Sequence, residues 1–209
     1  MGTLGKIFDR FARGFVRRAG VISGTAWSVA NSGFLFKDYL QNRTPHVMEQ
    51  ASGALSLSAS GIMLLTDKFP RLKIPAGICA LLGTVAMGIG AWGQKGQNAQ
   101  IFAASVTSTF ALSMIFEKSF NNAARKMADS SKRVLRAVFT PLAKSPVAAT
   151  AALDVTLSSL PMAYAAITRR DVPLFVMSML WVTGGLAAMA TDNSVKAWLT
   201  RQPKTPHIS

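Results

Sequence analysis

The stretch VPLFVMSMLWVTGGLAAMAT, residues 172–191, contains no charged side chain and decides the fold class. Crossing the ~30 Å hydrocarbon core of a bilayer takes ~20 residues of α-helix, because each residue advances the helix by ~1.5 Å. The stretch is 20 residues long and has no charged face, whereas a helix at the surface of a soluble protein needs one. It therefore predicts a membrane-spanning helix.

Five further stretches of the chain have the same character. Four are free of charged residues, and the fifth contains a single one, Asp154. All five have lengths that suit a membrane-spanning helix, and a 209-residue soluble protein has too little interior to bury six such helices. We therefore predict an all-α, polytopic integral membrane bundle of about six transmembrane helices. The predicted spans are residues 19–36, 50–66, 74–94, 96–116, 145–168 and 172–191.

The basic residues are unevenly distributed between the two sides of the predicted bundle. The chain has 23 Lys and Arg against 9 Asp and Glu, a net charge of +14. If the N-terminus lies inside, 18 of the 23 fall on the inside segments 1–18, 67–73, 117–144 and 192–209. Cytoplasmic loops of membrane proteins accumulate Lys and Arg in this way. The pattern predicts a bacterial inner-membrane protein with both termini in the cytoplasm, and it accounts for the basicity without a nucleic-acid partner.

Residues 1–18 carry apolar side chains at helical spacing, with basic side chains elsewhere around the same helix. The apolar residues are Leu4, Ile7, Phe8, Phe11 and Phe15. Such a basic amphipathic helix lies in the membrane interface and turns its basic face toward anionic lipid headgroups. An Arg-rich, acid-poor N-terminus is also typical of a mitochondrial transit peptide, so the mitochondrial inner membrane is the alternative location.

A basic cytoplasmic connection, residues 117–144, separates a first membrane part, 19–116, from a second, 145–191. Residues 192–209 form the predicted cytoplasmic tail. The latter half of the connection places apolar side chains on one helical face, so part of it is expected to lie in the interface. These side chains are Val134, Leu135, Val138, Phe139 and Leu142.

The sequence contains no motif of a soluble enzyme. No Walker loop, GxGxxG, HExxH or pair of spaced carboxylates occurs. The single cysteine, Cys79, allows neither a disulfide within the chain nor a cysteine metal cluster. We therefore predict no enzymatic activity, no cofactor and no metal.

Small polar side chains recur at i, i+4 spacing in several predicted spans, and this spacing places them along one side of a helix. The candidate polar-pathway residues are Asn31 in the first span, Ser56 and Ser60 in the second, Ser105 and Thr109 in the fourth, and Thr150 and Ser158 in the fifth. Small hydroxyl side chains also let membrane helices approach and bond to each other. The stripes therefore predict either a polar pathway or helix packing.

Asp154 lies about ten residues into the fifth predicted span. An acid at that depth costs ~2.5–3.5 kcal/mol, so we expect it to face the interior of the bundle, near hydroxyls of another span. Pro161 has no N–H, so the Leu157 carbonyl would lose its helical partner and become available to a cation. Three interpretations stay open: proton or cation coupling, structural hydrogen bonding, and a shifted span that leaves Asp154 near the membrane surface.

Two functions are compatible with these features. The first is a small transporter or permease with Asp154 as a protonatable group within the membrane. The alternative is a non-catalytic membrane subunit, scaffold or assembly factor, whose basic amphipathic segments bind anionic lipid or an acidic partner. The expected partners are the lipid bilayer, anionic lipid headgroups, and either another membrane protein or a second copy of the chain.

Overall fold

The computed structural model describes residues 10–11, 13–40, 46–92, 98–130, 140, 143–192 and 194–195, with the backbone alone for residues 37–40. The described residues form eight α-helices: α2 (Ala19–Leu40), α3 (Val47–Met63), α4 (Lys73–Ala91), α5 (Asn98–Ile115), α6 (Glu117–Ser130), α8 (Pro146–Asp154), α9 (Leu160–Arg169) and α10 (Val172–Met189). A 3₁₀ turn, Pro70–Leu72, precedes α4, and a π-helical turn, Val155–Ser159, joins α8 to α9. The all-α prediction is confirmed.

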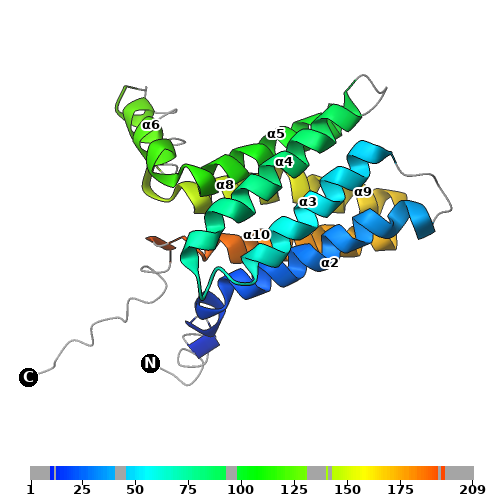
Figure 1. The fold of residues 1–209 in the computed structure, drawn as a ribbon, viewed down its shortest axis with the longest axis horizontal. Helices are drawn as coiled ribbons and strands as arrows, with labels where there is room; N and C mark the ends of the chain where they lie inside the picture. The colour runs from blue at the N-terminus through cyan, green and yellow to red at the C-terminus, as the bar shows by residue number, and fades with distance from the viewer. Residues whose placement is uncertain are drawn as a thin grey trace, which may run out of the picture.

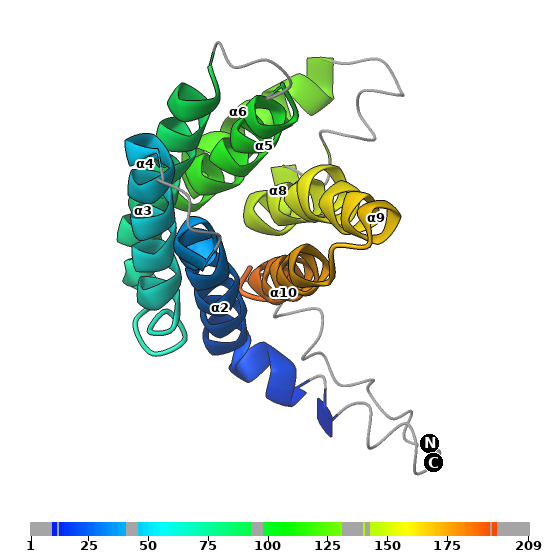
Figure 2. The ribbon, with the colours of Figure 1, turned by 90° about the vertical axis from the view of Figure 1, so that its right-hand side faces the viewer.

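All of these helices except α6 form a closed ring in chain order (Figure 2). Each of α2 to α5 packs against the next helix, α5 packs against α8, and α10 packs against α8, α9 and α2. Neighbours in the ring run in opposite directions (Figure 1). The connections of α2 to α3, α3 to α4, α4 to α5 and α9 to α10 are short, whereas α5 and α8 are joined by a long connection that includes α6. The N-terminus of α2, the α3–α4 connection, the C-terminus of α5 and the C-terminus of α10 therefore meet at one end of the bundle (Figure 1).

We call this end the basic end, because most of the described lysines and arginines lie there. They are Arg10, Arg13, Arg17, Arg18, Lys68, Arg71, Lys73, Lys118, Arg125, Lys126 and Lys144. Arg169, the last residue of α9, and Arg170, which follows it, lie at the opposite end. The N-terminal segment is helical at residues 10–11 and 13–17, and Val16 is buried against Ala19 and Ala190. The rest of the predicted 1–18 helix lies outside the described residues, as do Val134, Leu135, Val138, Phe139 and Leu142.

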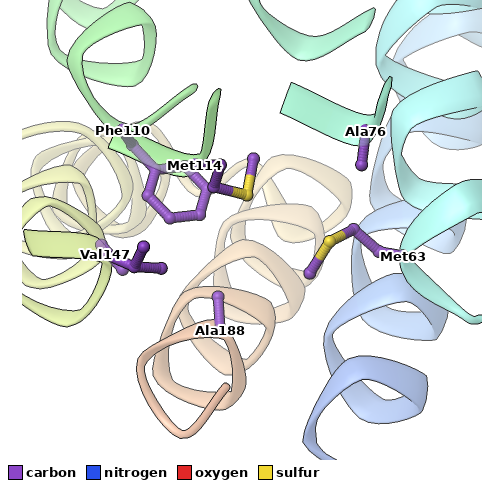
Figure 3. Close-up of a cluster of buried hydrophobic side chains, with 7 residues drawn as sticks. Met63, Ala76, Phe110, Met114, Val147 and Ala188 are labelled. Carbon is purple, nitrogen blue, oxygen red and sulfur yellow. The ribbon is translucent and has the colours of Figure 1, made fainter. Parts of the chain in front are cut away.

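The largest buried apolar cluster draws on the whole ring and lies toward the basic end (Figure 3). It contains Met63, Ala76, Phe110, Met114, Val147, Ala151 and Ala188, from α3, α4, α5, α8 and α10, and Trp27 of α2 packs against it. The other buried apolar residues are mostly alanines, interspersed with buried glycine, serine and threonine. Small interior side chains let helices approach closely, as they do in membrane proteins.

Many large apolar side chains outside this cluster point outward. On α4, Ile74, Ile78, Leu82, Val85 and Ile89 follow one another at helical spacing and are each about half exposed. The outer face of α10 continues the pattern with Val172, Val176, Met179 and Leu186. Monomeric soluble proteins rarely expose continuous apolar faces of this extent. Lipid is the environment that these faces fit.

Three helical stretches are long and apolar enough to cross a membrane: Pro70–Ala91, Pro146–Arg169 and Val172–Met189. A fourth is added if α5 and α6, which are bent by 111° at their junction, count as one broken span. The two remaining predicted spans fall on α2 and α3. Polar residues lower the hydropathy of α2, and α3 has only 17 residues. By length and composition, the described residues thus supply three or four candidate spans.

The first turn of α2 is capped by a residue from another part of the chain. Asp67, in the turn after α3, accepts hydrogen bonds from the amides of Gly20 and Val21, each at 3.0 Å. A negative charge at a helix N-terminus is favourable because the unpaired amides carry partial positive charge. Gly20 permits the contact, since a Cβ there would overlap Thr66 Oγ1 and crowd the Asp67 carboxylate.

Asp67→Ala is expected to lower the free energy of unfolding by about 1–2 kcal/mol, because two first-turn amides lose their acceptor. Thermal unfolding of the purified protein in detergent measures the change. Glu49→Gln, at an exposed acid in the first turn of α3, is the matched comparison and should cost less, about 0.3–1 kcal/mol, because it removes only a charge near a helix N-terminus. Equal melting temperatures for the two variants would contradict the capping role.

Candidate functional site at Asp154

Asp154 is the last residue of α8 and lies inside the apolar stretch Pro146–Arg169. Nine residues of α-helix bring it about 12 Å from the start of that stretch. The π-helical turn begins at the next residue. The acid is therefore positioned within a candidate membrane span, beside an irregularity in the backbone of the same helix.

The carboxylate of Asp154 contacts a neighbouring helix. Thr107 Oγ1, on α5, donates a hydrogen bond of 2.6 Å to Asp154 Oδ1. About one turn of α8 toward the basic end, Thr150 Oγ1 lies 2.7 Å from Ser113 Oγ, and both residues are buried. The α5–α8 interface is thus held by two polar contacts, and Asp154 faces another helix of the bundle.

Ser158 lies one turn beyond Asp154, within the π-helical turn. Its hydroxyl is buried near the Asp154 carboxylate and makes no hydrogen bond of good geometry with the described residues. The Leu160 amide donates to the Val155 carbonyl, five residues earlier, instead of to the residue four earlier. Pro161 follows directly and supplies no amide to the helix. Single π turns inside α-helices occur frequently at functional sites.

Asn31, Ser56 and Ser60 form a separate polar group between α2 and α3. Asn31 Nδ2 donates to Ser60 Oγ at 3.0 Å and to the Ser56 carbonyl at 3.3 Å. Ser60 Oγ donates to the same carbonyl at 2.7 Å. This arrangement satisfies polar atoms at a helix interface, and no hydrogen bond joins it to Asp154.

Ser105 and Thr109 are outside both groups. Their hydroxyls donate to carbonyls of their own helix, Ile101 at 2.9 Å and Ser105 at 3.0 Å respectively. Ser105 is exposed and lines a shallow pocket between α4 and α5, beside the hydrogen-bonded pair Thr84 and Ser108. The eight predicted candidates therefore occupy three places in the fold.

Sequence reasoning missed Thr107, the residue that meets Asp154. Hydroxyls occupy positions 105, 107, 108, 109 and 113 of α5, so they point to nearly every side of that helix. Spacing alone does not say which of them faces α8. Sequence reasoning also missed Asp192, a buried acid shortly after the C-terminus of α10. Its carboxylate accepts a hydrogen bond from the Ser194 amide at 2.8 Å.

The groups at Asp154 are all oxygen ligands. A carboxylate with one oxygen held by Thr107, together with the buried Ser158 hydroxyl, suits a proton or a small hard cation, since hard cations prefer oxygen. Within the part of the chain that the structure describes, no group of three or more His, Cys, Asp or Glu side chains is arranged to hold a metal ion. The site therefore has one titratable group and neutral hydroxyls around it.

Comparisons with protein-family models, curated proteins and solved structures found no match for this chain. What the protein does must therefore follow from its own residues and their contacts.

Proposed function

We propose that the protein is a small membrane transporter or permease in which Asp154 takes up and releases a proton or small cation. The observation that carries the proposal is the contact of Asp154 with Thr107 of another helix, beside a π-helical turn with an unpartnered buried hydroxyl. Acids within membrane spans are costly, and they commonly mark proton and ion pathways.

The interrupted helix supports this role. Transporters often build their ion sites where a membrane helix is broken, because the backbone there offers polar groups that a regular helix keeps paired. The stretch from α8 through the π turn to α9 has such an irregularity directly after Asp154. Movement at the π turn would change the distance between the Asp154 carboxylate and the Ser158 hydroxyl, and with it the affinity for a cation.

In this proposal all six helical segments of the ring cross a bacterial inner membrane, with both termini in the cytoplasm. The alternating helix directions and the gathering of described lysines and arginines at one end support it. Asn31 of α2 donates a hydrogen bond to Ser60 of α3. Because these polar side chains satisfy each other, the two helices can cross the bilayer despite their lower hydropathy. The N-terminal segment then binds anionic headgroups through Arg10, Arg13 and Arg17.

Reporter fusions test this topology. After Ser209, a reporter that works in the cytoplasm is expected to be active. At residues 94–100, a reporter that works outside the membrane is expected to be active. The reason is that the two sites follow an even number and an odd number of crossings. An externally active reporter after Ser209 would overturn the proposed orientation.

Flux measurements test the transport proposal. The purified protein is reconstituted in vesicles that contain a pH-sensitive or a sodium-sensitive dye, and a potassium diffusion potential drives cation entry. Proton or sodium entry above that of protein-free vesicles is the expected result. If neither ion enters faster, the transport proposal fails.

The second candidate is a non-catalytic membrane subunit or assembly factor. It is favoured by the completed hydrogen bond from Thr107 to Asp154, which would serve equally well to hold α5 against α8. Absence of flux together with purification of the chain in a stable membrane assembly would favour this role.

A further inference from the structure

Helix α6 leaves the bundle at the basic end. It follows α5 after a bend of 111° at Phe116, so it runs nearly perpendicular to the ring helices (Figure 1). Its contacts with the rest of the fold are few and involve α5 and α8. If α5 crosses a membrane, α6 lies close to the plane of the membrane surface.

The side chains of α6 divide into three faces. Ala124 and Ala128 are buried. Phe120 and Met127 share a second face, because seven residues make almost two helical turns, and Met127 is 49% exposed. Lys118 and Arg125, also seven residues apart, are exposed on the side of the helix opposite that face, with Lys126 beside them and the exposed acid Asp129 one turn after Arg125. The helix thus has a partly exposed apolar face and an exposed, mainly basic face.

We propose that α6 is an interfacial helix that docks on the headgroups of anionic phospholipids, with Phe120 and Met127 inserted among the acyl chains. The proposal rests on the membrane orientation proposed for α5. Charge complementarity supports lipid as the occupant, because α6 carries three lysines and arginines against two acids, and residues 117–144 as a whole carry seven against two. One of these acids, Glu117, lies at the N-terminus of α6, where a negative charge stabilises the helix.

The position of α6 in the fold also favours lipid. A basic amphipathic helix in the membrane interface turns its apolar side toward the acyl chains and its basic side toward the phosphates. The N-terminal segment presents Arg10, Arg13 and Arg17 at the same end of the bundle. Two basic helical elements therefore face the same layer of headgroups.

The test uses the full chain with Cys79→Ser and one new cysteine, either Met127→Cys on the apolar face or Asn122→Cys on the exposed polar side. Each cysteine carries an environment-sensitive fluorophore, and the protein is reconstituted in phosphatidylcholine alone or mixed with phosphatidylglycerol. In the anionic vesicles, lipid-attached nitroxides should quench the probe at 127, whereas aqueous iodide should quench the probe at 122.

Removing the basic face should undo the docking. Lys118→Gln, Arg125→Gln and Lys126→Gln together are expected to lower the docked-to-undocked ratio about fivefold for each charge removed. Arg169→Gln with Arg170→Gln, at the opposite end of the bundle, is the control and should leave the quenching at 127 unchanged.

Two results would overturn the proposal. Equal iodide quenching at 127 and 122 in anionic vesicles would show that α6 does not enter the interface. Shielding of the probe at 127 from both quenchers, in neutral and anionic vesicles alike, would show that protein covers this face. A flotation assay after a carbonate wash tests separately whether the protein is inserted in the membrane. A protein that is not inserted would not float with the lipid, and this result would contradict the membrane orientation proposed for α5.

Discussion

Asp154→Asn is expected to abolish cation entry into the reconstituted vesicles while the abundance of the protein stays nearly unchanged. The asparagine side chain has almost the same shape as aspartate, and its amide oxygen can accept the hydrogen bond from Thr107. It has no carboxyl group to take up a proton or to neutralise a cation. The substitution thus removes the proposed chemistry and keeps the contact between α5 and α8. The flux assay and the yield of purified protein give the two measurements.

Two further variants complete this experiment. Asp171→Asn is the control, because Asp171 caps α10 through the Leu174 amide at 2.9 Å and lies outside the spans. It should retain the flux. Asp154→Leu leaves the Thr107 hydroxyl without its acceptor, at a cost of about 0.6–2 kcal/mol, and should lower abundance. If Asp154→Asn keeps full flux while Asp154→Leu lowers abundance, Asp154 is a structural residue and the transport mechanism is wrong.

Gly184→Ala is expected to lower the free energy of unfolding by about 1–3 kcal/mol, and Gly184→Leu by more. A Cβ at Gly184 would overlap the indole ring of Trp27 on α2. That ring packs edge-on against Phe110 of the largest buried apolar cluster, with 5.7 Å between centroids, and its Nε1 donates to the Trp181 carbonyl at 3.4 Å. Moving Trp27 therefore disturbs the α2–α10 contact that closes the ring. Thermal unfolding in detergent measures the loss.

Gly61→Ala is the matched control for this packing prediction. Gly61 also lies in a helix, α3, and a Cβ there would meet no atom within 4 Å. The substitution should be neutral or stabilise the protein by about 0.4–1 kcal/mol, because alanine restricts the unfolded chain. Trp27→Phe in the Gly184→Ala protein should recover part of the lost stability. Equal stability of the Gly184→Ala and Gly61→Ala proteins would show that the Trp27 contact is not tight.

Much of the helical framework could be read from the sequence. Each predicted span falls on a helix, and the long run 145–168 was correctly placed although it contains Asp154. The signal is strong because a charged residue inside an apolar helix is costly in lipid, so charges mark the ends of the runs. The sequence predicts six crossings, but by length and hydropathy the described helices supply three or four candidates, because polar residues lower the hydropathy of α2 and α3 has only 17 residues.

The sequence predicted only part of the candidate site. Asp154 was identified because it is the single charge in its run, and Pro161 signalled a disturbed helix. The stripe of Ser105 and Thr109 was expected to contribute either to a polar pathway or to helix packing. Their hydroxyls bond to carbonyls of their own helix, and Thr107 meets the Asp154 carboxylate. A helix that is apolar nearly all round gives little sign of which side faces the interior.

The sequence by itself determined the class of the protein: all-helical, with apolar segments between basic ones and a lone acid in the fifth segment. These properties depend on the composition of short stretches and on the cost of placing charge in hydrocarbon. Tertiary structure alone decided that Asp154 meets Thr107, that Asp67 caps α2, and that α6 turns away from α5. The two side-chain contacts join residues 47 positions apart in the chain. They depend on the rotation and close approach of packed helices, which the pattern within one helix does not specify.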